Sequence, residues 1–309
     1  MNRREFVAAG AGLLATPAWS SLLAQKGQNR TRLILLGTGG GPRARVDRVA
    51  SAQVIVVNDI AYVIDCGDGV SRQLVAAGIP LTQLRHILLT HNHSDHNLDY
   101  GNLIYSAWIA GLDKRIDTWG PPPLEKMTKL YFEMNDYDID IRIEDERKIP
   151  LAPLVHAHEL TQGGVVLNEG GVKVTSALVP HPLVKPAFAY RFDTPDRSIV
   201  ISGDTAPSDS LIHLSKGCDV LVHEAMYLPA IDKLVARTPN VTRLKEHILA
   251  SHTTAEDAGR VAQAAGAKVL VLSHLIPADD RSITDEMWIS AARTNFRGQI
   301  IVGRDLLEV

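Results

Sequence analysis

The most constraining feature of the sequence is a cluster of ligand-type side chains directly after an apolar run. Residues 86–90 read HILLT, a short β-type segment, and the following stretch HNHSDH carries His91, His93, Asp95 and His96. Crowded imidazoles at the end of a buried strand cost free energy unless a bound group compensates them. Imidazole and carboxylate are the ligands that suit zinc and similar divalent metals. We therefore expect a metal centre where this strand ends.

Three later β-type runs end in polar residues in the same way. His181 follows TSALVP, Asp204 follows IVISG, and His274 follows VLVLS. Since α/β folds assemble their sites where strands end at one edge of a sheet, these side chains are expected to converge with the first cluster.

The order of predicted elements indicates the fold class. Each half of the chain supplies several strands followed by helices, and two strands near the start, 51–57 and 60–67, are joined by the hairpin turn Asn58-Asp59. Residues 136–163 carry many charges and are expected to form peripheral strands and loops, and residues 299–309 one closing strand. The pattern predicts an α/β fold of two sheets packed face to face with helices outside, a four-layer αββα sandwich.

Composition gives little reason to expect an extended charged partner. The chain has 309 residues, a formal net charge of −3 and no stripe of Lys and Arg, which predicts a small-molecule substrate and no nucleic acid partner. Two cysteines, Cys66 and Cys218, do not make a disulfide framework; we expect buried thiols, and a bridge between them stays open. A homodimer is compatible with the sequence.

The first 26 residues differ from the rest. Arg3 and Arg4 precede a run rich in Ala, Gly and Leu that is too short and too interrupted for a membrane span. Residues 1–26 are therefore predicted to be a signal peptide, and the Arg-Arg-x-Phe start resembles a twin-arginine signal. Residues 27–309 would then form one exported or periplasmic domain, with no stable membrane insertion after cleavage.

The stretch THNHSDH matches the H-x-H-x-D-H signature of the metallo-β-lactamase superfamily. The resemblance extends over about residues 31–280, because DCGDG at 65–69 matches the first motif and the later strand ends match the remaining motifs in order. It implies a metallo-β-lactamase fold, two Zn²⁺ ions (or Mn²⁺ or Fe²⁺), and a hydroxide bridging the metals as the nucleophile. It also implies that Asp65 supports the metal-binding loop. The ligands it implies are His91, His93 and His181 for one metal and Asp95, His96 and His274 for the other, with Asp204 bridging.

Two further stretches resemble the ribonuclease Z group of this superfamily. They are VHEAMY at 222–227 and ILASHTTAEDAG at 248–259, and they imply that Glu224 and His252 act as a catalytic pair, with Asp95 as the third catalytic residue. A carboxylate hydrogen-bonded to an imidazole is expected to raise the basicity of the histidine and keep an acid available near neutral pH.

Departures from that group turn the functional hypothesis toward small substrates. The chain shows no basic, Gly-rich arm, and LIPADD follows His274 where the group has Ser-x-Arg. We therefore expect a metal-dependent hydrolase that cleaves an ester-type bond in a small aryl substrate, a sulfate or phosphate ester, like the arylsulfatases and phosphodiesterases of the same branch. The alternatives are a β-lactam or lactone hydrolase, a ribonuclease Z-type tRNA 3′ endonuclease, and a non-catalytic periplasmic binding protein.

Other candidate residues are assigned lesser roles. His156 and His158 are expected at a peripheral strand and His213 on a structural helix, whereas His247 could line the mouth of the pocket. Trp108 and Trp119 are expected in the core rather than in a substrate pocket.

Overall fold

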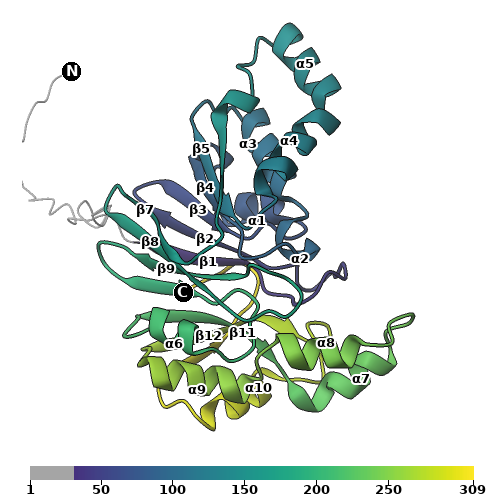
Figure 1. Cartoon of the computed structure of the whole chain (residues 1–309), viewed down its shortest axis with the longest axis vertical. Helices are drawn as coiled ribbons and strands as arrows, with labels where there is room; N and C mark the ends of the chain where they lie inside the picture. Colours follow the sequence, from purple (N-terminus) through teal and green to yellow (C-terminus); the bar gives the residue numbers. More distant parts are fainter. Residues whose placement is uncertain (1–30) are drawn as a thin grey trace, which may run out of the picture.

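The computed structural model describes residues 31–309, so the predicted signal peptide lies outside the described residues. Two seven-stranded sheets pack face to face, and helices cover their outer faces (Figure 1). The predicted four-layer αββα sandwich is confirmed. In residues 31–309 no helix has the length and apolar character needed to cross a membrane.

The first sheet comes mainly from the first half of the chain. Its strand order is β14-β1-β2-β3-β4-β5-β6, antiparallel from β14 to β3 and parallel from β3 to β6. Its strands are β1 (Arg32–Gly37), β2 (Ala52–Val57), β3 (Ile60–Ile64), β4 (Leu84–Leu88), β5 (Ile116–Gly120), β6 (Val155–Glu159) and β14 (Leu307–Glu308).

The second sheet repeats this plan with strand order β13-β12-β11-β10-β9-β8-β7. Strands β10 to β13 are parallel, and β7 to β10 are antiparallel. Its strands are β7 (Gly164–Glu169), β8 (Val172–Leu178), β9 (Phe188–Asp193), β10 (Ser198–Ile201), β11 (Val220–Met226), β12 (Val269–Ile276) and β13 (Gln299–Val302).

Helices follow the parallel strands and cover the outer faces of the two sheets. Those after the strands of the first sheet are α1 (Val70–Ala76), η1 (Leu81–Gln83), α2 (Ser94–Asn97), α3 (Tyr100–Ile109), α4 (Leu124–Met134), α5 (Asp136–Asp145) and η2 (Ala152–Leu154). Those of the second half are α6 (Asp209–Leu214), η3 (Leu228–Ala230), α7 (Ile231–Ala236), α8 (Leu244–Ser251), α9 (Ala255–Ala265) and α10 (Asp285–Arg293).

The apolar core has three main parts, one between the sheets and one under each helical layer. Between the sheets, the aromatic side chains of Phe188, Tyr190 and Phe192 on β9 pack against strands of the first sheet. Cys66 lies in the core under the first helical layer and Cys218 under the second, and both thiols are free and buried. The bridge left open by the sequence does not form between them.

The turn at Asn58-Asp59 forms as predicted. Asn58 and Asp59 have φ values of 52° and 61°, which is the left-handed conformation that a two-residue type I′ hairpin requires. Strands β2 and β3 pair directly on either side of it.

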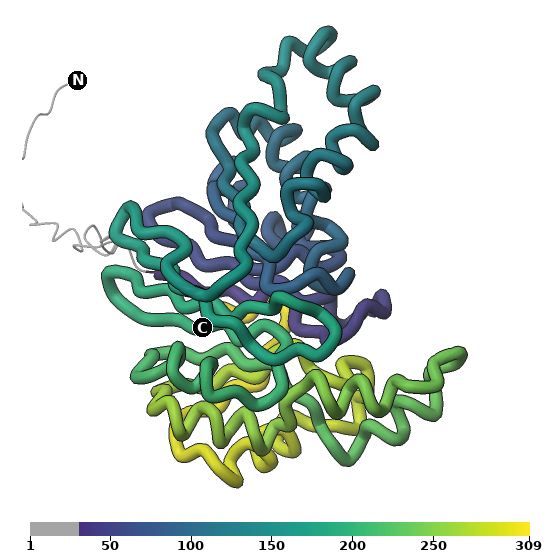
Figure 2. The backbone as a smooth tube through the Cα atoms, in the orientation of Figure 1, coloured from purple at the N-terminus to yellow at the C-terminus, as the bar shows by residue number. Residues whose placement is uncertain are grey.

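The closing strand predicted at the C-terminus is wrong in one respect. Residues 299–309 form two strands, β13 in the second sheet and β14 in the first, so the end of the chain crosses from one sheet to the other (Figure 2). Gly303 lies between them, and a Cβ there would come within 2.7 Å of the Leu272 carbonyl oxygen. The crossing thus depends on a residue without a side chain.

The charged segment after residue 135 also differs from expectation. Asp136–Asp145 is the helix α5, which projects with α4 from the body of the molecule (Figure 1). Its sequence alternates polar and apolar residues like a strand, but Ile139 and Ile143, four residues apart, both contact the core. Arg142 pairs with Asp138 and Glu146 at the same helical spacing. Tertiary contacts and ion pairs outweigh the two-residue alternation.

Replacing His86 with phenylalanine is expected to reduce the loss of stability in acid. The His86 ring stacks between Tyr62 and Trp119, and burial lowers the pKa of His86 from 6.5 to about 4. The unfolded chain therefore binds the extra proton first, and the free energy of unfolding falls as pH drops from 6.5 to 4. This residue accounts for on the order of 3 kcal/mol of that fall.

Urea unfolding of wild type and His86→Phe across this pH range measures the difference. His158→Phe is the matched control, because the His158 side chain is 40% exposed. Parallel pH profiles for wild type and His86→Phe would contradict the assignment.

Candidate metal centre

All seven ligand-type residues predicted from the sequence meet at one edge of the two sheets. The first sheet supplies His91 and His93 after β4 and Asp95 and His96 in α2, while the second supplies residues after β8, after β10 and within β12. Six of the seven are buried, and His93 is half-buried. The residues from the second sheet are His181, Asp204 and His274.

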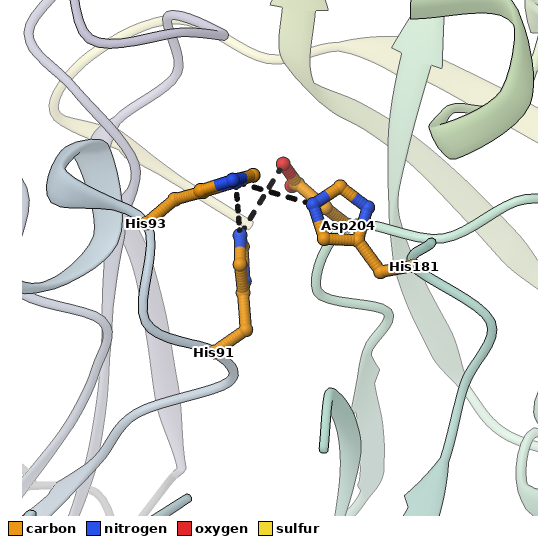
Figure 3. Close-up of side chains that lie close together, drawn as sticks. All are labelled: His91, His93, His181 and Asp204. Carbon is orange, nitrogen blue, oxygen red and sulfur yellow. Dashed lines mark hydrogen bonds and ion pairs between the residues drawn. The ribbon is translucent and has the colours of Figure 1, made fainter. Parts of the chain in front are cut away.

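One group consists of His91, His93, His181 and Asp204 (Figure 3). His93 Nδ1 lies 3.1 Å from His91 Nε2 and 3.2 Å from His181 Nε2, and His91 Nε2 lies 3.8 Å from Asp204 Oδ2. Two imidazole nitrogens that share a tetrahedral Zn²⁺ at about 2.0–2.1 Å are roughly 3.3 Å apart. The spacing of these three nitrogens fits one metal ion.

The second group consists of Asp95, His96, Asp204 and His274. His274 Nε2 lies 3.2 Å from Asp95 Oδ2 and 3.3 Å from Asp204 Oδ2, and His96 Nε2 lies 3.4 Å from the same Asp204 oxygen. Asp204 belongs to both groups, as a bridging carboxylate would. The buried atoms His96 Nε2 and Asp204 Oδ1 have no hydrogen-bond partner within residues 31–309, so they fit a metal ligand better than a closed polar network.

Asp65 supports the metal-binding loop through Thr90 and His96. Its carboxylate accepts from the Thr90 amide at 2.8 Å and the Thr90 hydroxyl at 2.9 Å, and it lies 2.7 Å from His96 Nδ1. The contact to Nδ1 leaves His96 Nε2 directed at the metal cluster. Asp65 has a φ of 62°, a conformation that is unusual for a residue with a side chain and that persists here because these contacts fix it.

The glycines at 39–41 help to position the metal ligands Asp95 and His274. The Gly41 amide donates to Asp95 Oδ2 at 2.9 Å, and the amides of Gly39 and Gly40 donate to backbone carbonyls. A Cβ on Gly40 would lie 2.9 Å from His274 Nδ1. These amides are therefore occupied, and close approach to His274 explains a glycine at position 40.

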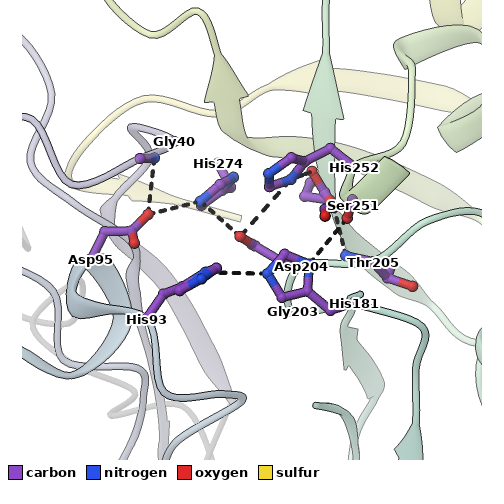
Figure 4. A network of polar contacts seen from close by, with 12 residues as sticks. Gly40, His93, Asp95, His181, Gly203, Asp204, Thr205, Ser251, His252 and His274 are labelled. Atoms are coloured by element: carbon purple, nitrogen blue, oxygen red, sulfur yellow. Dashed lines mark hydrogen bonds and ion pairs between the residues drawn. The ribbon is translucent and has the colours of Figure 1, made fainter. Parts of the chain in front are cut away.

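Glu224 and His252 form the pair that the sequence predicted. Glu224 Oε2 lies 2.8 Å from His252 Nδ1, and Glu224 Oε1 accepts from the Thr205 amide at 2.6 Å. The pair lies beside the metal cluster, with His252 Nδ1 3.9 Å from Asp204 Oδ2 (Figure 4). His223, the next residue on β11, turns its Nδ1 to the Glu224 carbonyl and stays outside both ligand groups.

Burial sets the proton affinities of this pair. It raises the pKa of Glu224 well above its ordinary range, with the charge of Asp204 adding to the effect, and it lowers the pKa of His252. Both directions favour a neutral pair that shares one proton between Oε2 and Nδ1. The expected rise in the basicity of His252 is not seen, because desolvation of the buried ring outweighs the charges of Asp204 and Asp95, which act to raise its pKa.

The pKa of Asp204 shifts in the opposite direction to that of Glu224, although both carboxylates are buried. Burial alone would raise its pKa, but the imidazoles of His274 and His96 hold the pKa well below its usual range. The carboxylate is therefore ionised and available as a ligand to two cations.

A cavity of about 400 Å³ opens directly onto this cluster. His93, Asp204 and His252 line its floor, and His247, which the sequence left open, lines its wall. No sequence pattern indicated the rest of this wall, whose side chains come from α7, α8 and the loop between them. That wall contains Leu234, Thr238, Val241, Leu244 and Ile248.

The remaining histidines and tryptophans singled out from the sequence lie outside the cluster of ligand residues. His158 on β6 contacts Asp117 at 2.7 Å, and the Trp119 ring is stacked between His86 and His158. Trp108 is buried under the first helical layer, and His213 lies on α6. Neither tryptophan lines the cavity, in agreement with the core positions expected for them.

Substituting Asp65 with asparagine is expected to weaken metal binding about 10- to 100-fold, because the residue that orients a metal-binding histidine contributes that much to affinity. Competition with a chromophoric chelator measures the change. Asp117→Asn is the matched control, since its carboxylate contacts His158 at the same 2.7 Å distance away from the cluster. Equal metal affinities for Asp65→Asn and wild type would exclude this role for Asp65.

Comparison with known proteins identifies the family. A family model described as the β-lactamase superfamily domain matches residues 61–275. Ribonuclease Z of Mycobacterium bovis (strain BCG / Pasteur 1173P2) is 31% identical over 280 residues, which cover 90% of this chain and 97% of that protein. Ribonuclease Z of Mycobacterium sp. (strain KMS) is 33% identical over 278 residues, covering 89% and 94%.

Solved structures agree on the fold. Human tRNase Z, short form, has a TM-score of 0.67 at 21% identity and covers 90% of this chain and 98% of its own. The metallo-β-lactamase fold protein YhfI from Bacillus subtilis has a TM-score of 0.65 at 22% identity, with the same coverage of both chains. This fold implies a dinuclear divalent metal site, which the two ligand groups fit.

These relatives correct the sequence-based expectation about partners. The exclusion of nucleic acid is wrong, because the relatives at 31% and 33% identity are named ribonucleases, and none of those described here is an arylsulfatase. The net charge of −3 misled because it sums the whole chain, whereas divalent cations in a site of this kind would add positive charge locally. On the family model and the relatives together, this chain belongs to the metallo-β-lactamase superfamily and is a metal-dependent hydrolase.

Proposed function

We propose that this protein is a ribonuclease that hydrolyses a phosphodiester bond near the 3′ end of a precursor tRNA, as the name of its relatives suggests. The observation that carries the proposal is the Glu224–His252 pair, held at 2.8 Å beside the metal ligands, in a chain that shares 31% identity with a ribonuclease Z over nine-tenths of its length. A phosphodiester hydrolase needs such a proton-carrying group for the leaving oxygen.

Zinc is the proposed metal, because imidazole-rich sites with a few carboxylates suit it. His91, His93 and His181 would hold one ion, Asp95, His96 and His274 the other, and Asp204 both. When bound, the two ions supply an activated water and stabilise charge on the attacked phosphoryl oxygens.

The protein's own residues have three tasks in this proposal. Asp65 and the Gly41 amide orient His96 and Asp95. Thr205, through its amide, holds Glu224 Oε1, which leaves Oε2 for His252. With Nδ1 occupied by Glu224, the second ring nitrogen of His252 is the atom that hands a proton to the leaving oxygen.

A second candidate function is hydrolysis of small aryl sulfate or phosphate esters, the function first expected from the sequence. The observation in its favour is the charge of the projecting helix α5, which carries five carboxylates and one arginine. Such a surface repels a polyphosphate backbone, and its effect extends over roughly a Debye length of about 8–10 Å.

Metal-loaded wild type is expected to cleave a precursor tRNA at its 3′ side, and His252→Ala is expected to lower kcat about 10²- to 10⁴-fold without loss of metal. His158→Ala, outside the cavity, serves as the control. Gel analysis of labelled RNA and metal analysis by mass spectrometry measure both effects. Aryl sulfate, aryl phosphodiester, cephalosporin and lactone substrates are assayed in parallel; cleavage of one of these with intact RNA would overturn the ribonuclease proposal.

We also propose that residues 1–26 are an export signal of the twin-arginine type and that residues 27–309 are the mature domain. Mass spectrometry of protein purified from separate cell fractions tests this. The expected result is a shortened chain outside the cytoplasm that starts near residue 27. An intact N-terminus in the cytoplasm would contradict export. Export would separate the protein from precursor tRNA, so a shortened chain outside the cytoplasm would favour the small-ester candidate over the ribonuclease.

A further inference from the structure

The cavity over the metal cluster has two chemically different sides. Its floor is polar and contains His93, Asp204 and His252, where an ester would be cleaved. Its opposite side is formed by aliphatic side chains of α7, α8 and their connecting loop, together with the end of β12. We define the apolar wall as Leu234, Val241, Leu244, Ile248 and Ile276.

The apolar wall is built on a packed support. Ile248 and Ile276 are 4% and 6% exposed and form a buried cluster with Met226 and Ile231. Leu234 and Leu244 pack against this cluster from the cavity side. The Met226 amide also donates to the Thr253 carbonyl at 2.8 Å, which ties the support to the segment that carries His252. The wall therefore keeps a defined position relative to Glu224–His252.

Part of the apolar wall is exposed to solvent and is not covered by other parts of residues 31–309. Val241 is 42% exposed, and Leu244 is half-buried. Leaving such side chains partly wet costs free energy that a bound apolar group would recover. At the mouth of the cavity, Arg43 and Asp279 lie 3.8 Å apart, so their opposite charges compensate each other. The cavity thus offers an apolar side to one part of a substrate and a metal cluster to another.

We infer that the apolar wall is a subsite for one flat, unpaired ring attached to the ester that is cleaved, either a nucleobase or an aryl group. The inference deepens the proposed function and rests on it only for the position of the ester at the metal cluster. A ring lies against aliphatic side chains through its face, while its phosphate or sulfate reaches the floor.

The size of the cavity limits what can enter. At about 400 Å³ it is near the lower end of small-molecule pockets, which span about 300–1,000 Å³. The proposed subsite takes one base with its sugar. In this proposal an RNA substrate is single-stranded at the cleaved bond, with its base splayed out of the stack, as is common in recognition of single-stranded RNA.

His247 adds one polar contact to the subsite. Its ring centroid lies 5.9 Å from both His93 and His252, and it lines the cavity on α8, the helix that also carries Leu244 and Ile248. The Ser251 hydroxyl lies 3.4 Å from His247 Nδ1 and leaves Nε2 free to contact an oxygen next to the ring.

The test compares the affinities of three ligands for the zinc-loaded full-length protein by calorimetry: inorganic phosphate, phenyl phosphate and adenosine monophosphate. Wild type is expected to bind at least one ring-bearing ligand about 10-fold or more tightly than phosphate. Leu244→Trp, which fills the subsite, should reduce this ring preference to less than about 3-fold and leave the affinity for inorganic phosphate and the metal content unchanged. Val241→Asp, which charges the apolar wall, should also reduce the ring preference, while its carboxylate weakens the binding of all three anionic ligands.

Leu249→Trp is the matched control, because Leu249 lies on the same helix, is 43% exposed and does not line the cavity. It should retain the ring preference of wild type. The ligand with the larger gain in affinity over inorganic phosphate, either adenosine monophosphate or phenyl phosphate, identifies the preferred ring. The inference is overturned if wild type shows no ring preference, or if both Leu244→Trp and Val241→Asp retain it. Failure of the proposed ribonuclease activity would look different: RNA would stay intact while the ring preference persisted.

Discussion

The rest of the site depends on one buried carboxylate, that of Asp204. Its Oδ2 lies between 3.3 and 3.9 Å from nitrogens of His91, His96, His252 and His274, so the ionised carboxylate gathers imidazoles from both sheets. Burial opposes that charge, and the surrounding imidazoles offset the cost. The preceding Gly203 has a φ of 59°, and a Cβ there would lie 2.6 Å from the Phe188 carbonyl oxygen. The position of Asp204 therefore depends on a glycine at position 203, where a side chain would clash.

The metal cluster forms only when the two sheets are packed together. The Phe188 amide donates to the Thr90 carbonyl at 2.9 Å, and the Tyr190 hydroxyl donates to the Leu89 carbonyl at 2.8 Å, directly before His91. The strand that carries the first four ligands is therefore fastened to β9 of the opposite sheet. Phe188 and Tyr190 also fill the core between the sheets, so the packing that stabilises the fold aligns the ligands. Stability and metal geometry share the same contacts.

Reaction type and specificity come from different parts of the molecule. The strands and the segments that follow them supply the metal ligands and Glu224, and His252 caps the end of α8. Such groups are common to hydrolysis of many esters. The apolar wall comes from α7, α8 and their loop, which lie outside the central sheets. The end of α8 is tied to the ligands, because the Ser251 carbonyl lies 3.2 Å from His181 Nδ1 and His252 follows it. The acidic α5 and the single-ring cavity constrain which RNA, or which small ester, can approach. A ribonuclease with this surface would engage an unpaired end and not a duplex.

The sequence by itself determined the elements that depend on neighbouring residues: the Asn58-Asp59 hairpin, the strand that ends in His91, and the spacing of His91, His93, Asp95 and His96. The motif resemblance also brought Glu224 and His252 together correctly, 28 residues apart, at 2.8 Å. Tertiary structure decided the rest. It made α5 a helix because Ile139 and Ile143 reach the core, and it divided residues 299–309 between two sheets. It also built the apolar wall, because exposed Val241 and buried Ile248 and Ile276 become one surface only when α7 and α8 fold over the end of β12. Local patterns cannot specify such a surface, since its members share no spacing along the chain.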